Sequence, residues 1–291
     1  MSYDIGAMPS STKIIEIVEH LKDWLEKQPH LPNIEDKEWI KTFLYNNKFS
    51  VEKTKIKLDA YYSLKNKYPS ILKNRDPCSQ EILRAKQALI LCSASKLTKD
   101  GYRLLYNKFD SRPELLNFTA FMKRIFMVAD MFHLEQNRLT NYIVLADCQN
   151  IKYQHFLRLA PGLATLSEIL SKAYTERVVG LHMINVPSFI FKMVDFMKRH
   201  LPEKLGSRIY VHSSENDISL CDFIDEDVLS CDYGGKGQSI AECDDSCQKL
   251  LEKHASWFKE QDNVCSDESL RMLGVCKFEE LTGSFRTLDI D

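Results

Sequence analysis

The chain has 291 residues, of which 44% are apolar and 27% are charged, and its formal net charge is −2. This composition excludes a disordered chain and fits one large domain, or one domain joined to a small helical one. No apolar run reaches the length of a transmembrane helix and the polar N-terminus lacks a signal-peptide core, so we expect a cytoplasmic protein.

Charge is distributed unevenly along the chain. Residues 1–214 contain 32 basic and 22 acidic residues, whereas residues 215–291 contain 7 basic and 19 acidic residues. The basic part predicts an anionic partner such as a lipid surface, and the acidic part either screens that charge or stays solvated. Nucleic acid is disfavoured, because no nucleic-acid-binding signature is present.

The nine cysteines are odd in number and scattered, which favours reduced thiols over a disulfide framework. Cys243, Cys247 and His254 have a spacing that is poor for zinc, so no metal is expected.

The first part of the chain is predicted to contain only helices. Ser10 and its neighbours can cap a helix that ends near Lys27, and Leu31–Pro32–Asn33 breaks the pattern. Apolar residues then recur at helical spacing over residues 34–47 and 50–68, with Ser50 as a cap. The polar stretch 73–80 is a predicted joint, so residues 10–75 are expected to form a helical domain.

After residue 101 the pattern changes to short β-rich runs that alternate with helical stretches. The predicted strands are residues 102–106, 142–147, 178–184 and 208–212, and the predicted helices lie around 113–132, 161–174 and 187–201. This alternation is typical of an α/β domain with a mostly parallel sheet, expected over residues 76–238. Residues 239–291 are predicted to be an acidic extension with a helix near 242–257 and a loosely held end.

The segment between Pro187 and Pro202 predicts a helix with two contrasting faces. An apolar ring, Phe191, interrupts its polar face near Lys192 and Lys198, which suits a membrane interface. An ordinary core helix with one stray phenylalanine is the alternative. The apolar arc consists of Phe189, Ile190, Met193, Val194, Phe196, Met197, His200 and Leu201.

The usual signatures of α/β enzymes are absent from the sequence, so we expect no enzymatic activity. Residues 234–239 resemble a phosphate loop only faintly and are predicted to be a turn. Asp147, at the end of a predicted strand, is interpreted as a loop acceptor, and His182 as a hydrogen-bonded core histidine. A lipid-metabolising enzyme would need a nucleophile and a base near these two residues.

Several motifs recur in one order along residues 12–238. They include Leu31–Pro32 with Trp39 and Tyr61–Tyr62, the run VGLHMINVP at 179–187, the run RIYVH at 208–212 and DYGG at 232–235. Together they resemble the CRAL-TRIO lipid-binding family, most closely its tocopherol- and retinaldehyde-binding members. The resemblance implies a helical N-terminal domain beside a sheet domain with a lipid pocket, covered by a mobile gate helix near 188–201.

The resemblance also implies which residues line the pocket. Because side chains alternate between the two faces of a strand, Tyr142, Val144 and Ala146 are expected on one face. Each of them can equally be a core residue that packs against a helix. Ala146 stands where relatives often have a larger aromatic residue, which suggests a roomier pocket. The expected ligand-binding residues are Phe121, Ile125, Tyr142, Val144, Ala146, Ile169, Leu170, Tyr174, Leu181, Phe189, Met193, Val194 and Met197.

A basic cluster of Arg177, Lys204 and Arg208 matches positions that bind a phosphoinositide headgroup in the tocopherol-binding members. The fourth position is the neutral Asn47, so weaker headgroup binding is expected. Phe191, Lys192 and Lys198 are the expected membrane contacts.

We therefore expect a monomeric carrier of one tocopherol-, retinoid- or carotenoid-type ligand, without a cofactor and with peripheral membrane association. The alternative is a phospholipid exchanger or a phosphoinositide-presenting signalling module.

Overall fold

The computed structural model describes residues 9–135, 141–174, 177–201, 203–212 and 220–272. Within these ranges, the side chains of Arg177, Met197, His200 and Lys204 lie outside the description.

Helices alone form the N-terminal part, and side-chain caps fix where they begin. Ser10, Asp36, Ser50 and Ser79 each accept a hydrogen bond from a backbone N–H of the first helical turn. The predicted caps Ser10 and Ser50 are confirmed, whereas the second helix begins after Asp36, later than the apolar pattern suggested. The helices are α1 (Ser11–Glu26), α2 (Lys37–Asn46), α3 (Val51–Lys67), α4 (Pro69–Leu72) and α5 (Gln80–Ala88).

One five-stranded sheet follows, with the strands in chain order β1-β2-β3-β4-β5. The β1–β2 pair is antiparallel, and the other three pairs are parallel, as expected for an α/β domain. The strands are β1 (Leu89–Leu97), β2 (Arg103–Phe109), β3 (Asn141–Asp147), β4 (Arg177–Ile184) and β5 (Ile209–Val211). The sequence did not predict β1, because its short apolar run cannot be told from a buried helix by periodicity.

The remaining helices connect the strands or follow them. They are α6 (Phe118–Glu135), α7 (Tyr153–Leu159), α8 (Leu163–Lys172), α9 (Ile190–His200), α10 (Glu203–Gly206), α11 (Ile240–Lys253) and α12 (Ala255–Glu260). Short 3-10 turns occupy Pro113–Leu115, Ala160–Gly162, Leu220–Asp222, Cys231–Tyr233, Gln261–Asn263 and Glu268–Leu270. None of the described helices is long and apolar enough to cross a membrane.

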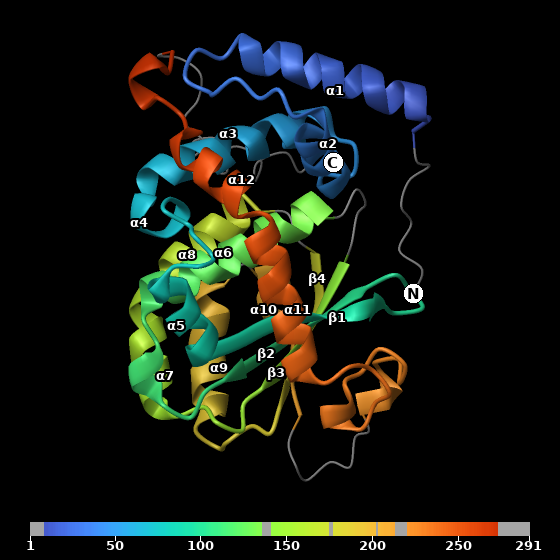
Figure 1. The fold of residues 1–291 in the computed structure, drawn as a ribbon, viewed down its shortest axis with the longest axis vertical. Helices are drawn as coiled ribbons and strands as arrows, with labels where there is room; N and C mark the ends of the chain where they lie inside the picture. The colour runs from blue at the N-terminus through green and yellow to red at the C-terminus, as the bar shows by residue number, and fades with distance from the viewer. Residues whose placement is uncertain (1–8, 136–140, 175–176, 202, 213–219, 273–291) are drawn as a thin grey trace, which may run out of the picture.

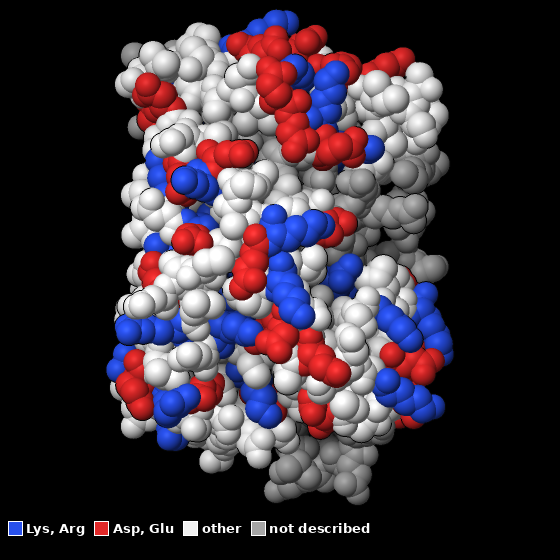
Figure 2. Space-filling view, viewed as in Figure 1, with Lys and Arg blue, Asp and Glu red and all other residues white. Residues whose placement is uncertain are grey.

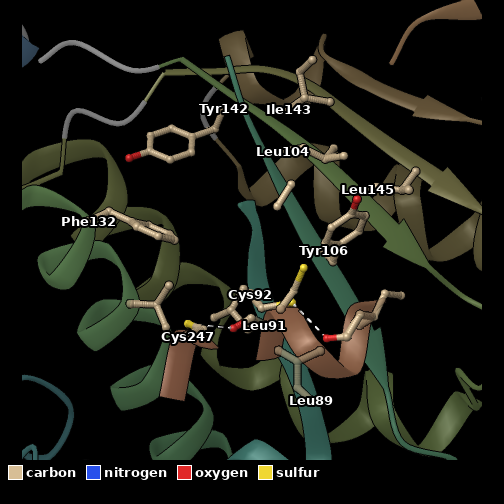
Figure 3. Close-up of a cluster of buried hydrophobic side chains, with 14 of the residues drawn as sticks. Leu89, Leu91, Cys92, Leu104, Tyr106, Phe132, Tyr142, Ile143, Leu145 and Cys247 are labelled. Carbon is tan, nitrogen blue, oxygen red and sulfur yellow. Dashed lines mark hydrogen bonds between the residues drawn. The ribbon is translucent and has the colours of Figure 1, made fainter. Parts of the chain in front are cut away.

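Helix α11 covers one face of the sheet, which we call the outer face (Figure 1). The Cys92 thiol on β1 contacts the carbonyl of Ile240 at the start of α11, and the Cys247 thiol contacts the Leu91 carbonyl. Tyr106 on β2 donates its hydroxyl hydrogen to the Val228 carbonyl. Figure 3 shows the apolar side chains that this packing buries between the strands and α11.

The opposite face, here called the inner face, is turned toward α6, α7 and α9. The strand register aligns Leu105, Val144 and Leu181 across β2, β3 and β4 on this face. Two residues further along these strands, and on the same face, Asn107 lies beside Ala146. The ring of Phe109, also on this face, lies 6.2 Å from Phe121 on α6, so the inner face packs against these helices.

The C-terminal part is integrated into the fold. Cys243, Cys247 and Leu251 on α11 are buried in the same cluster as the outer face of the sheet. Beyond α12, the Arg271 guanidinium donates two hydrogen bonds to Asp59 on α3, at 2.8 and 2.9 Å. The expectation of a loosely held end is therefore wrong for the described residues up to 272.

Ion pairs join this acidic part to the basic body that precedes it. Lys86 lies 2.9 Å from Asp245, and Arg124 lies 3.2 Å from Asp244. Figure 2 accordingly shows acidic and basic side chains intermingled on the face that carries α11. The sequence left open whether the acidic part screens the basic charge or stays solvated. For α11, these ion pairs favour screening.

A buried polar cluster ties the N-terminal helices to the sheet domain. Asp130 on α6 accepts hydrogen bonds from Arg75 (2.6 Å), Tyr61 (2.9 Å) and Tyr174 (3.0 Å). The side chains of Arg75 and Asp130 are both 0% exposed. The predicted joint at 73–80 thus contains a fully buried charge rather than a solvated linker.

Candidate ligand-binding site

Three buried clusters meet along the inner face, and apolar side chains between them are only half-buried. Phe121 and Ile125 on α6 border both the cluster of the sheet and that of the N-terminal helices. Ala146 and Leu181 border the third cluster, beneath α9. Apolar side chains that point inward but retain exposed surface are packed incompletely. We call Leu105, Phe109, Phe121, Ile125, Ala146, Leu170 and Leu181 the apolar zone.

Helix α9 packs its apolar face beside Ala146 and Leu181 of the zone. Ile190, Met193 and Val194 are 1%, 9% and 4% exposed and pack in one cluster with Met183 of β4. On one flank of the helix, Phe196 makes an edge contact with Phe156 of α7, at 5.3 Å between ring centroids. The half-buried Phe189 borders the same cluster just before α9 begins.

The polar face of α9 is turned to solvent. Lys192 and Lys198 are exposed, and the Phe191 side chain is 45% exposed. The amphipathic pattern read from the sequence thus describes this helix, including its outward phenylalanine. The membrane role of that face stays a prediction.

The turn that leads into α9 is anchored by Asp147, at the end of β3. Asn185, whose backbone has a positive φ of 53°, donates from its amide nitrogen to Oδ1 of Asp147 at 2.9 Å. The other carboxylate oxygen accepts from Lys108 (2.8 Å) and from the Tyr233 hydroxyl (3.0 Å).

Burial raises the pKa of Asp147, but the hydrogen bonds from Lys108 and Asn185 outweigh it and leave the pKa below its usual value. The interpretation of Asp147 as an acceptor is confirmed, and these partners leave it poorly suited to act as a base.

His182 lies on the outer face, on the side of β4 away from the apolar zone. Its ring is stacked on those of Phe223 (4.3 Å) and Tyr210 (5.0 Å), and a ring nitrogen is hydrogen-bonded to His212 at 3.0 Å. Burial and the neighbouring His212 lower the pKa of His182 to about 4. The predicted hydrogen bond is present, although the His182 side chain is half-buried rather than in the core.

Tyr142 and Val144 have their side chains on the inner face, as the strand periodicity predicted, and both are buried. The Tyr142 ring packs 6.1 Å from Phe132 at the end of α6, and Figure 3 shows the two rings near each other. The prediction that Tyr142, Val144 and Ala146 share a face is therefore confirmed.

Two further expected wall residues, Ile169 and Tyr174, are buried among helices. Ile169 is fully buried in the cluster of the N-terminal helices. The Tyr174 hydroxyl is bonded to Asp130, and its ring is stacked on Phe126 at 4.8 Å. Both residues were expected in the wall from the family resemblance, and in the structure they pack against α3 and α6; their contact with a ligand stays a prediction.

The expected basic cluster is only partly described. Arg177 begins β4, and Lys204 lies in α10, shortly before Arg208 in the chain. The Arg208 guanidinium donates to the Val178 carbonyl and is half-buried. Asn47 is 8% exposed and its amide donates to the Phe43 carbonyl at 2.9 Å, so it closes α2 instead of facing a headgroup. The side chain of Met197 also lies outside the described part.

Sequence reasoning missed several residues of the inner face, among them Leu105, Phe109 and the polar Asn107. The Oδ1 atom of Asn107 is buried and has no hydrogen-bond partner. The alternation of β2 could have placed Asn107 inward, had the strand been extended beyond Tyr106.

Comparisons with known proteins agree with this architecture. A family model described as the CRAL/TRIO domain matches residues 88–235, and one described as the Pinta-like UBA domain matches residues 10–82. The human alpha-tocopherol transfer protein-like protein is 22% identical over 222 residues, which cover 75% of this chain and 64% of that protein. Clavesin-1 of Xenopus laevis is 25% identical over 175 residues, which cover 60% of this chain and 46% of that protein.

The matched segment therefore spans less than two thirds of these curated relatives. Among solved structures, the crystal structure of Sfh5 superposes with a TM-score of 0.50 at 11% identity, covering 81% of this chain and 92% of that one. At this identity the likeness concerns the fold alone.

Proposed function

This chain belongs to the CRAL-TRIO family of lipid-binding proteins, and we propose that it carries one hydrophobic ligand in the apolar zone and transfers it between membranes. The observation that carries the proposal is the half-buried state of inward apolar side chains beneath α9. A hydrocarbon ligand would complete their burial, which stabilises a complex by about 25 cal/mol for each Å² of apolar surface removed from water.

The zone also limits the chemistry of the ligand. Its seven side chains are uncharged, so an ionised ligand group lying among them would have no partner; the nearest charge on this face of β2 is that of the half-buried Arg103, two residues before Leu105. We therefore expect a neutral, mostly hydrocarbon molecule with one polar end, of tocopherol, retinoid or carotenoid type. A phospholipid or phosphatidylinositol exchanger is the second candidate, favoured by the nearby basic positions Arg177, Lys204 and Arg208.

Mass spectrometry of the lipid that copurifies with the protein tests this proposal directly. Competition among tocopherol, retinoids, carotenoids, sterols and phosphatidylinositol then ranks the ligand classes. Preferential binding of phosphatidylinositol would refute the proposal of a neutral-lipid carrier and favour the phospholipid exchanger.

The two faces of α9 have separable roles in this proposal. The helix opens at its N-terminal turn, the freed apolar face inserts at a bilayer, and Phe191 leads while Lys192 and Lys198 meet headgroups. Pro202, at the other end of this helix, lies outside the described residues.

Phe191→Asp and Met193→Asp form a matched pair that tests the gate. Burying the remaining half of a phenylalanine side chain is worth roughly 1 kcal/mol, so Phe191→Asp should slow transfer to vesicles about fivefold or more. Retention of a fluorescent ligand should change little. Met193→Asp should instead empty the site, because its carboxylate would be buried among Ile190, Val194 and Met183. Equal damage to transfer and retention by Phe191→Asp would refute the gate.

The basic cluster predicts salt-dependent binding to anionic vesicles. Arg177→Glu combined with Lys204→Glu should weaken capture by vesicles that contain a phosphoinositide, while ligand affinity in solution stays nearly unchanged. Arg208 is the poorer choice because its guanidinium already holds the Val178 carbonyl. Capture by this variant equal to that of the wild type at low salt would show that the cluster is only a solvated surface.

A further inference from the structure

Asn107 is a polar side chain on an otherwise apolar stretch of the inner face. Its cross-strand neighbours are Leu91 on β1 and Ala146 on β3. Phe109, two residues further along the same side of β2, contacts Phe121 on α6. The Asn107 carboxamide therefore lies on the wall of the apolar zone.

The Oδ1 atom of Asn107 is buried, and no hydrogen bond reaches it. A buried carbonyl without a partner destabilises a protein, since it has lost its water and gained nothing in return. Arg75 and Arg124 also have buried nitrogen atoms without partners, but their other nitrogens pair with carboxylates. Such an acceptor, beside half-buried apolar groups, points to a ligand that supplies the missing hydrogen.

We infer that Asn107 binds the polar end of the ligand and that this end is a hydroxyl group. A hydroxyl both donates and accepts, so it can donate to Oδ1 and accept from Nδ2 of the same carboxamide. An ether, ester or aldehyde oxygen only accepts and leaves Oδ1 unpaired. A carboxylate has the same defect and adds a buried charge. The ligand is thus an alcohol or phenol with a large hydrocarbon body; this inference rests on the proposed carrier function.

The first test uses the ligand-free protein. Asn107→Leu removes the unpaired acceptor and keeps the branched shape and the number of heavy atoms of the side chain, so the midpoint of thermal unfolding should rise by about 2–4 °C. Asn150→Leu is the matched control, because Asn150 is also half-buried but donates from Nδ2 to the Phe109 carbonyl at 3.2 Å. Its unfolding midpoint should fall. A fall in both variants would show that Asn107 is satisfied and would overturn the inference.

The second test measures binding of two matched pairs, retinol with its methyl ether and α-tocopherol with its methyl ether. In at least one pair the wild-type protein should prefer the alcohol by about tenfold, and Asn107→Leu should reduce that preference to below about twofold. Affinity of the variant for the ether should stay within about threefold of the wild-type value.

The outcomes separate this inference from the carrier function. Retention of the alcohol preference in Asn107→Leu, or equal affinity of the wild type for alcohol and ether, would overturn the role of Asn107 while the carrier function stands. Failure of the wild type to bind any of the four compounds, together with the absence of a copurifying lipid, would overturn the carrier function and this inference with it.

Discussion

The buried pair of Arg75 and Asp130 gives the sharpest prediction about the stability of this protein. Both side chains are 0% exposed, and Asp130 also accepts hydrogen bonds from Tyr61 and Tyr174. Replacing Asp130 by Asn keeps the shape but leaves the Arg75 charge without a counter-ion. Removal of one partner from a buried pair costs about 3–5 kcal/mol, because the remaining charge is neither solvated nor compensated.

This loss is large compared with the total stability of a domain, which is about 5–15 kcal/mol. With a urea m-value of about 3 kcal/mol/M, it lowers the unfolding midpoint by at least about 1 M. The control is Asp110→Asn, which breaks the exposed pair with Arg112 and should cost less than about 1 kcal/mol. Both variants should be unfolded in urea and followed by far-UV circular dichroism.

Replacing both partners of the pair sharpens the test. In Arg75→Met with Asp130→Leu no charge is left unpaired, so this double variant should recover much of the stability that Asp130→Asn loses. A loss below about 1 kcal/mol for Asp130→Asn, equal to that of the surface control, would refute the reasoning.

Two further predictions concern the outer face and the turn before α11. Burial and His212 lower the folded-state pKa of His182 to about 4, so its contribution to stability is present above the unfolded pKa of 6.5 and is lost as the pH falls from 6.5 toward 4. His182→Phe should therefore lessen the fall of the unfolding midpoint over this range; an unchanged pH profile would contradict the assignment. A Cβ at Gly235 would lie 2.0 Å from the Leu229 carbonyl oxygen, so Gly235→Ala should cost about 1–3 kcal/mol in urea unfolding. Gly101→Ala is the control: its Cβ would meet nothing within 4 Å, so it should cost less even though the backbone of Gly101 has a positive φ of 76°.

Local chemistry in the sequence determined the helices, the parallel strands and the two faces of α9. Ser10 and Ser50 cap helices through their own first turns, so their roles need no distant partner. The outward position of Phe191 likewise follows from the helical period alone. The family could be recognised because its motifs recur in order along more than half of the chain.

Tertiary structure alone decided which apolar side chains line the inner face and which pack elsewhere. Ile169 and Tyr174 are apolar or aromatic like Ile125, but they pack against α3 and α6. The local sequence does not show which distant element a side chain will contact. The missing partner of Asn107 depends on β1 and β3, which are distant in sequence.

The same holds for the acidic part. The charge of this part predicted a segment that is solvated or that screens the basic body. Its ion pairs with Lys86 and Arg124 form only because the fold brings these basic residues opposite α11. Sequence fixes what each side chain can bond to, and the packing of distant elements decides which of those bonds is made.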